Sequence, residues 1–266
     1  MHAKPVSDLR GPVRALFSDV DGTMTTGERI DAATFAALER LGESGIPVVM
    51  VTGRSAGFGD ACIRMLPVLA VVAENGGVTF VRDGHRITKS YGVPASTIPE
   101  WRRRMMVAIA DVMADVPGVQ LSGDSVYREV DLAIDWNEEV SLPVTDAERC
   151  VEILRGAGFI AVRSSVHVHC SPPGFDKLTA SKLVIDRVLG GDGNELSPYV
   201  FVGDALNDAP MFGGFPRSVG VANVKLWWDQ LPHRPAYVTS HSGGAGLREL
   251  VEHLLTLPRR AVPSPR

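Results

Sequence analysis

The chain has 266 residues, of which 45% are hydrophobic, and it carries a formal net charge of -4 with a pI near 6.0. This composition is typical of a globular protein with a sizeable core, and the acidic balance argues against general nucleic-acid binding, which usually needs a basic excess. The three cysteines are odd in number and widely spaced, which predicts buried thiols in a reducing compartment. No apolar run reaches the roughly 20 residues that a membrane helix needs. We therefore expect a soluble, cytoplasmic protein with no nucleic-acid, membrane or obligate protein partner.

The first predicted strand, residues 13–17, is followed directly by Asp19-Val-Asp21-Gly-Thr23. Ligands gather at the carboxyl edge of open α/β sheets, where such a segment would lie. Two carboxylates there can bind Mg²⁺ through oxygen ligands, or they can divide the roles of nucleophile and acid/base between them. The alternative is a loop in which aspartate and glycine only form a turn.

A second short apolar run, residues 48–51, ends in Thr52-Gly53-Arg54. A helix is predicted to follow at 55–66. The Thr52 hydroxyl and the backbone N–H groups at the start of that helix can cradle a phosphate.

The segment 81–175 has a mixed pattern, which indicates an α+β insertion. Within and beside it we expect hairpin-like runs at 78–89, a helix at 96–116, a strand at 126–136, a helix at 146–157 and an extended run at 160–170. Pro172-Pro173-Gly174 then marks a linker back to the first domain.

Two of these extended runs have polar faces. In 160–170, strict alternation would put Arg163, His167 and His169 on one face, which either contacts a polar substrate or faces solvent. In 126–136, the alternate set includes Asp131 and Asp135, which could bind sugar hydroxyls but are more typical of a surface.

The α/β pattern resumes at Lys177, which begins a predicted helix. The strand at 199–202 then ends in Gly203-Asp204-Ala205-Leu206-Asn207-Asp208. These acidic groups are suited to completing an oxygen-rich metal site. The proline-rich tail, 259–266, is predicted to be disordered.

These motifs and their order resemble those of the haloacid dehalogenase superfamily of phosphohydrolases. The chain is most similar to subfamily IIB, which includes Cof-like, sucrose-phosphatase-like and mannosyl-3-phosphoglycerate-phosphatase-like enzymes. The segment Glu74-Asn75-Gly76-Gly77 also resembles the "ENGA" segment of that subfamily. Relatives usually have glycine after the motif lysine, where this chain has Leu178. Lys177 is favoured over Lys182 as that lysine because it begins the helix.

The resemblance implies an α/β fold with a doubly wound, Rossmann-like parallel-sheet core and an inserted α+β type-II cap. The implied core comprises residues 1–80 and 176–258, and the implied cap comprises 81–175.

The resemblance also implies a role for each motif residue. Asp19 is the nucleophile, Asp21 the general acid/base, and Lys177 and Thr52 hold the phosphoryl oxygens. Mg²⁺ is held by Asp19, Asp21 (through its backbone carbonyl), Asp204 and Asp208, with Asn207 orienting these ligands. Candidate substrate-binding residues are Thr52, Gly53, Arg54, Asn75, His167 and His169.

The function implied is Mg²⁺-dependent hydrolysis of a small phosphate monoester, a sugar or sugar-acid phosphate, through an aspartyl-phosphate intermediate. One alternative is a phosphomutase of the phosphomannomutase type. Another is a non-catalytic Mg²⁺-binding regulatory protein on the same fold, since fold alone does not prove activity.

Overall fold

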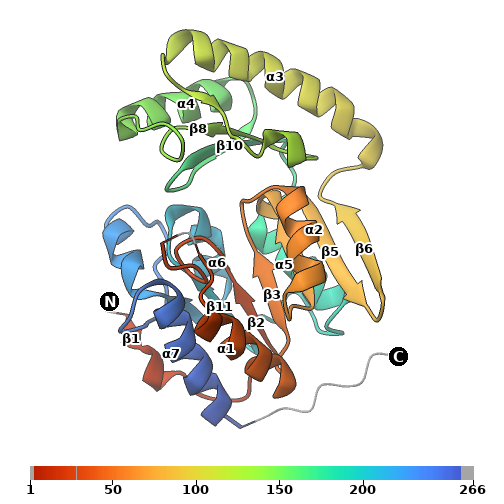
Figure 1. Ribbon diagram of the computed structural model, residues 1–266, viewed down its shortest axis with the longest axis vertical. Helices are drawn as coiled ribbons and strands as arrows, with labels where there is room; N and C mark the ends of the chain where they lie inside the picture. Colours follow the sequence, from red (N-terminus) through yellow and green to blue (C-terminus); the bar gives the residue numbers. More distant parts are fainter. Residues whose placement is uncertain (1–2, 28, 259–266) are drawn as a thin grey trace.

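Two sheets organise the part of the chain that the computed structural model describes, residues 3–27 and 29–258. The tail that was predicted to be disordered, 259–266, lies outside these residues. Figure 1 shows the smaller sheet with its helices standing above the larger one. Within the described residues, no helix combines the length and the apolar character needed to cross a lipid bilayer.

The larger sheet has nine strands in the order β1-β13-β12-β11-β2-β3-β4-β5-β6, and only the pairs that involve β5 and β6 are antiparallel. Its strands are β1 (Lys4–Pro5), β2 (Ala15–Ser18), β3 (Val48–Val51), β4 (Ala70–Ala73), β5 (Val78–Asp83), β6 (Arg86–Tyr91), β11 (Tyr199–Gly203), β12 (Ser218–Gly220) and β13 (Tyr237–Val238). The central strands β2, β3 and β4 are buried along their whole length, as expected for a parallel sheet covered on both faces.

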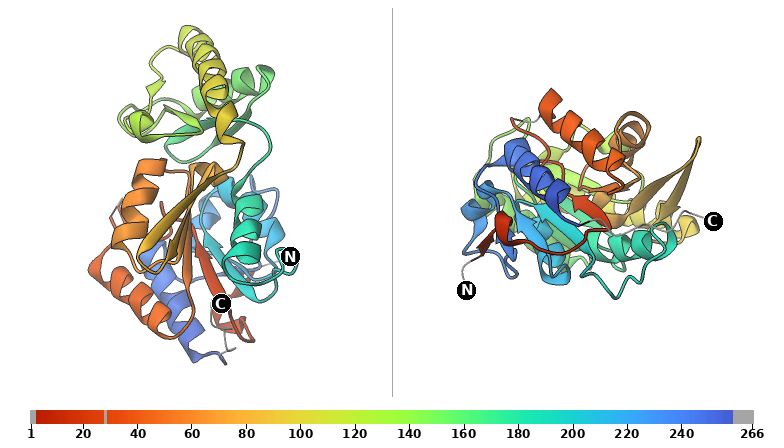
Figure 2. Two further views of the ribbon diagram at one scale, coloured as in Figure 1. Left: turned by 90° about the vertical axis from the view of Figure 1, so that its right-hand side faces the viewer. Right: turned by 90° about the horizontal axis from the view of Figure 1, so that it is seen from below.

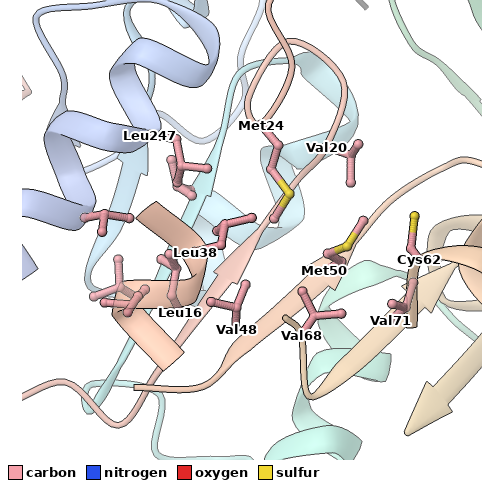
Figure 3. Packing of buried hydrophobic residues seen from close by; sticks show 14 of the residues in the cluster. Leu16, Val20, Met24, Leu38, Val48, Met50, Cys62, Val68, Val71 and Leu247 are labelled. Atoms are coloured by element: carbon pink, nitrogen blue, oxygen red, sulfur yellow. The ribbon is translucent and has the colours of Figure 1, made fainter. Parts of the chain in front are cut away.

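Helices cover both faces of this sheet (Figure 2). They are α1 (Ala32–Glu43), α2 (Ala56–Met65) and α7 (Gly243–Thr256) on one face, and α5 (Lys177–Arg187) and α6 (Ala209–Gly214) on the other. In Figure 3, Leu38 of α1 and Leu247 of α7 lie over Leu16, Val48 and Met50 of the sheet. This packing buries a continuous apolar layer, which is the main stabilising contribution to such a fold.

The smaller sheet has four antiparallel strands in the order β7-β8-β10-β9, with helices on one face. Its elements are β7 (Gln120–Leu121), β8 (Leu132–Asp135), β9 (Ile160–Arg163), β10 (His167–Ser171), α3 (Ile98–Asp115) and α4 (Val144–Gly156). Val168 and Cys170 of β10 point into the apolar layer beneath α3 and α4. The opposite face carries His167 and His169, since side chains alternate along a strand.

The predicted fold class, a doubly wound α/β sheet with an inserted α+β unit, is confirmed. The hairpin at 78–89, which we expected in the insertion, instead extends the larger sheet, because β5 pairs with β4 from Ala70↔Val81 to Ala73↔Val78. The boundary between the core and the cap at residue 81 stays a prediction. The four-stranded unit itself is reached only after β6.

Two of the predicted strands were wrong in detail. The run at 160–170 is a hairpin of β9 and β10, because the chain reverses where Ser164 Oγ accepts a hydrogen bond from the His167 N–H (2.9 Å). Arg163 therefore pairs with Val168 and lies on the opposite face from His167 and His169.

The run predicted as a strand at 126–136 begins as a 3-10 turn, η4 (Ser125–Tyr127), and becomes a strand only at Leu132. The expected surface position of Asp131 and Asp135 is also wrong, because both side chains are fully buried. Asp135 accepts hydrogen bonds from the N–H groups of Glu138 and Glu139 and so shapes the turn after β8.

Candidate active site

Three of the four sequence motifs meet at the carboxyl edge of the larger sheet. Asp19 follows β2, Thr52 follows β3, and Asp204 follows β11, and these three strands are neighbours in the sheet. The Asp19 N–H donates to the Val202 carbonyl (2.9 Å). Strand order therefore brings together residues that are far apart in the chain.

The acidic centre consists of Asp19, Asp204 and Asp208. All three side chains are buried, and each offers one oxygen within 4.8 Å of the others. Burial, with the charge of Asp208 and against that of Lys177, raises the pKa of Asp19 to about 8. Burial together with the charges of Asp19 and Asp208 raises the pKa of Asp204 well above its usual value. Three mutually repelling oxygen donors in one place fit a hard divalent cation.

Close packing fixes Asp204 within this centre. It accepts hydrogen bonds from Thr23 Oγ1 (3.2 Å) and from Asn223 Nδ2 (2.7 Å). A Cβ at Gly22 would lie 2.4 Å from Asp204 Oδ2, and Gly22 has a φ of +75°, so this position of the first motif needs glycine. Asn223 was not predicted, and no motif in the sequence singles it out.

Lys177 is the cation of the acidic centre. Its Nζ donates to Asp19 Oδ1 (2.7 Å) and to Asp208 Oδ1 (2.8 Å). Burial lowers the pKa of Lys177, but the adjacent carboxylates outweigh burial and raise the pKa above its usual value, so the group stays charged. Lys182 lies one turn further along α5, is half-buried, and has no side-chain hydrogen bond in the described part of the chain.

Asp208 acts mainly as a support in this arrangement. Its second oxygen, Oδ2, accepts hydrogen bonds from the backbone N–H groups of Asp204 (3.0 Å) and Ala205 (3.3 Å). Asp208 therefore holds both Lys177 and the loop that carries Asp204. Its neighbour Asn207 lines the cavity described below.

The second motif contributes backbone as well as side chains. Thr52 is fully buried, and its Oγ1 accepts a hydrogen bond from the Arg54 N–H (3.0 Å). The Asn75 N–H donates to the Thr52 carbonyl (3.0 Å). Gly53 lines the cavity, and a Cβ there would lie 2.9 Å from His169 Nε2. The close approach of the two sheets at this point requires glycine.

Asp21 is not one of the three acids of the acidic centre and is held by Arg54. Arg54 Nε donates to both Asp21 oxygens (2.8 and 2.9 Å), and Nη2 donates to Oδ1 (2.6 Å). The Arg54 guanidinium also lies 5.0 Å from the centroid of the Phe58 ring. Charge-assisted, forked hydrogen bonds of this kind fix orientation strongly.

A cavity between the two sheets connects these groups. It encloses about 60 Å³ of solvent space, enough for only a few water molecules. The larger sheet contributes Asp19, Asp21, Gly53, Arg54, Ala205 and Asn207, and the four-stranded unit contributes Asp124, Glu138, Ser164, Ser165, Val166, His167 and His169.

The two histidines face the cavity from β10. His167 Nε2 lies 2.8 Å from Glu138 Oε2, and His169 Nδ1 lies 3.5 Å from Asp131 Oδ2. Burial, reinforced by the charge of Arg128, lowers the pKa of His169 well below its usual value. His169 is therefore neutral near pH 7 and can offer a neutral ring nitrogen to a substrate.

A buried ion-pair network, which the sequence did not reveal, supports this face. Arg128 is fully buried and donates to Asp124, to Asp131 and to the Gly53 carbonyl. Asp124 also accepts a hydrogen bond from the Ser55 N–H (3.2 Å). The network joins the four-stranded unit to the start of α2.

Glu74 makes a second connection between the units. Its buried carboxylate accepts hydrogen bonds from the N–H groups of Ala56, Glu129, Val130 and Asp131 at 2.7–2.9 Å. Burial and the charge of Asp131 raise the pKa of Glu74 to about 7, against the opposing effect of these donors. Glu74 and Asn75 both have positive φ (51° and 52°), a strained conformation for such residues.

The sequence profile of haloacid dehalogenase-like hydrolases matches residues 16–101, a stretch that contains Asp19, Asp21 and Thr52. This match supports the haloacid dehalogenase-type phosphohydrolase that the motifs implied. It is 26% identical to the phosphoglycolate phosphatase of Methanothermobacter thermautotrophicus, over 91% of this chain and 99% of that protein. The family match and this relative together support the assignment of the chain as a phosphatase.

Two solved structures share its fold. The sucrose-phosphatase of Synechocystis has a TM-score of 0.67 at 20% identity, covering 92% of this chain and 98% of that one. A sugar phosphatase of subclass IIB has a TM-score of 0.62 at 16% identity, covering 91% and 98%. The resemblance to subfamily IIB is thus confirmed at the level of the fold.

Proposed function

We propose that the enzyme is a Mg²⁺-dependent phosphatase that hydrolyses a small phosphate monoester, a sugar or sugar-acid phosphate, through an aspartyl-phosphate on Asp19. The main support is the convergence of Asp19, Asp204, Asp208 and Lys177 at one edge of the sheet. Bound Mg²⁺ would supply positive charge against the phosphoryl oxygens. Asp19, Asp204 and the backbone carbonyl of Asp21 would hold the ion, with Asp208 behind them.

In the first half-reaction, a carboxylate oxygen of Asp19 attacks phosphorus and the bond from phosphorus to the leaving oxygen breaks. Asp21 gives its proton to the departing alkoxide. The Lys177 ammonium neutralises charge on the nucleophile side, and the Thr52–Gly53 segment faces the phosphoryl oxygens. Stabilisation of this charge is the main catalytic contribution expected in phosphoryl transfer.

In the second half-reaction, water attacks the same phosphorus and gives its proton to Asp21. The bond between phosphorus and Asp19 breaks, and inorganic phosphate leaves. His167 and His169 would close over the leaving group in the first step and limit access of other acceptors.

The test is phosphate release from p-nitrophenyl phosphate with Mg²⁺ by the wild type and Asp19→Asn. We expect a loss of roughly a thousandfold or more, as for removal of other enzymatic nucleophiles. Asp60→Asn is a matched control, because the Asp60 side chain is partly exposed on α2 and, among the described residues, forms its ion pair with Arg64. Wild-type turnover in Asp19→Asn would overturn the nucleophile assignment.

The substrate class is tested with a panel of phosphate monoesters: phosphoglycolate, sucrose phosphate and trehalose 6-phosphate. The first is the substrate named for the Methanothermobacter relative. A preference for one of these esters over p-nitrophenyl phosphate supports the proposal. Isomerisation of a hexose phosphate without phosphate release would instead indicate a phosphomutase.

A further inference from the structure

Two cationic side chains near the cavity, Lys177 and Arg128, are buried and bonded to protein oxygens. Lys177 is buried and bonded to Asp19 and Asp208. Arg128 is buried, and its Nε and both terminal nitrogens donate to protein oxygens. These two cations are therefore committed to the acidic centre and to the network beside α2.

Arg54 differs from both of them. Its side chain is 34% exposed, and it lines the cavity. Two of its five N–H groups, one on Nε and one on Nη2, are used for Asp21. The other three have no side-chain or backbone partner in the described part of the chain. They form the end of the guanidinium, which can bind a carboxylate through two parallel hydrogen bonds.

The position of this guanidinium is fixed before a ligand arrives. Asp21 holds one edge, and the Phe58 ring covers one face at 5.0 Å. Such preorganisation reduces the entropy that a ligand must lose to form its hydrogen bonds. Arg54 is thus a preorganised anion-binding group in direct contact with Asp21, the proposed general acid/base.

Four acids line the same cavity, namely Asp19, Asp21, Asp124 and Glu138. Asp19 is bonded to Lys177, Asp21 is bonded to Arg54 itself, and the other two also have partners. Asp124 accepts four hydrogen bonds, from Ser122, Ser55 and two nitrogens of Arg128. Glu138 lies against His167 at 2.8 Å. Each of these acids therefore has a partner, whereas Arg54 lines the cavity with N–H groups that have no partner in the described part of the chain and can bind a leaving group.

We propose that Arg54 is the specificity-determining residue of the enzyme and that it selects phosphate monoesters whose leaving group carries a carboxylate, as in a small hydroxy acid. This inference rests on the proposed phosphatase function. It adds a substrate class to that function, because Arg54 would make the enzyme prefer esters of hydroxy acids to esters of neutral sugars and polyols.

The experiment compares kcat/KM for phosphoglycolate and for 2-hydroxyethyl phosphate, in which a neutral hydroxymethyl group replaces the carboxylate. We expect the wild type to favour the acid by about tenfold or more, because hydrogen bonds between charged groups are worth at least that factor. In Arg54→Met the ratio should fall to about one. Arg54→Lys keeps the charge without the fork and should give an intermediate ratio.

Loss of Arg54 also releases Asp21, which slows hydrolysis of both esters to a similar extent. The ratio of the two kcat/KM values cancels this shared effect and so reports on selectivity alone. Arg64→Ala is the control, since Arg64 is an exposed arginine of α2 that pairs with Asp60. It should keep the wild-type ratio. Thermal melting of each variant checks that it is folded.

A wild-type ratio near or below one, or an unchanged ratio in Arg54→Met, would overturn this inference. If the wild type still releases phosphate from p-nitrophenyl phosphate in that case, the proposed function stands. If the wild type releases phosphate from none of these esters, the proposed function itself fails.

Discussion

The Arg163 guanidinium lies 5.4 Å from the centroid of the Trp227 ring, and this contact joins β9 of the four-stranded unit to η6 (Ala222–Trp227) of the larger sheet. The same guanidinium lies 5.6 Å from the centroid of the Trp136 ring. Arg163 therefore connects the units next to η5 (Leu206–Asp208), which carries Asp208 and contacts β9.

Removal of this contact should loosen the closed arrangement of the two units. For Trp227→Ala we expect KM to rise several-fold, since a partly desolvated cation–π contact is worth about 1–2 kcal/mol. The measurement is steady-state hydrolysis of p-nitrophenyl phosphate. Trp228→Ala is the control, because Trp228 stacks on the exposed Arg234 of its own segment. An equal rise of KM in both variants would contradict the role given to Trp227.

Replacement of Asp204 should change the thermal stability of the protein in opposite directions with and without Mg²⁺. Replacement of Asp204 by Asn removes repulsion with Asp19 and Asp208, so Asp204→Asn should melt at a higher temperature than the wild type in EDTA. Added Mg²⁺ should stabilise the wild type by ligand binding but stabilise the variant little. Thermal melts at several Mg²⁺ concentrations measure both effects.

The binding of Mg²⁺ to the acidic centre should also depend on pH. Since the pKa of Asp19 is raised to about 8, this carboxyl is largely protonated at pH 6 and must lose its proton to bind a cation. The Mg²⁺-induced rise in melting temperature should therefore grow between pH 6 and pH 8. A constant shift across this range would contradict the raised pKa.

Glu74 should make the stability of the protein depend on pH. Its pKa is raised from 4.5 to about 7 in the folded state, so the folded chain binds more protons than the unfolded chain between these values. The contribution of Glu74 to the free energy of unfolding is then fully present below pH 4.5 and is lost as the pH rises to about 7. The whole contribution is about 3 kcal/mol at most. Glu74→Gln cannot ionise. The difference in unfolding free energy, wild type minus variant, should thus fall from pH 4.5 to 7 in urea titrations.

Gly53→Ala should impair activity without preventing folding. The new methyl group would lie 2.9 Å from His169 Nε2 and 3.2 Å from Asn75 Nδ2, so the two faces of the cavity must separate. We expect kcat/KM to fall about tenfold or more, as small misplacements of a reacting group are costly. Gly42→Ala is the control, because a Cβ at this site in α1 meets no atom within 4 Å. It should preserve activity and stabilise the helix by up to about 1 kcal/mol. Equal activity in the two variants would contradict the close approach at Gly53.

The sequence by itself determined the strands β2, β3 and β11 and the residues at their carboxyl ends. Each of these strands is a short apolar run that Asp19, Thr52 or Asp204 follows directly, so local pattern and parallel pairing predicted that these residues meet. Lys177 begins its helix, as the sequence predicted, and the structure places its ammonium on Asp19.

Only the tertiary structure decided how the second half of the site is built. The reversal at Ser164 moved Arg163 to the face opposite the histidines. Packing within each unit paired Arg54 with Asp21 and Arg128 with Asp124, and docking of the units then brought Arg128 to the Gly53 carbonyl. Periodicity records which side chains share a face of one element. The pairing of charges across elements depends on how those elements pack, and nothing local in the chain specifies it.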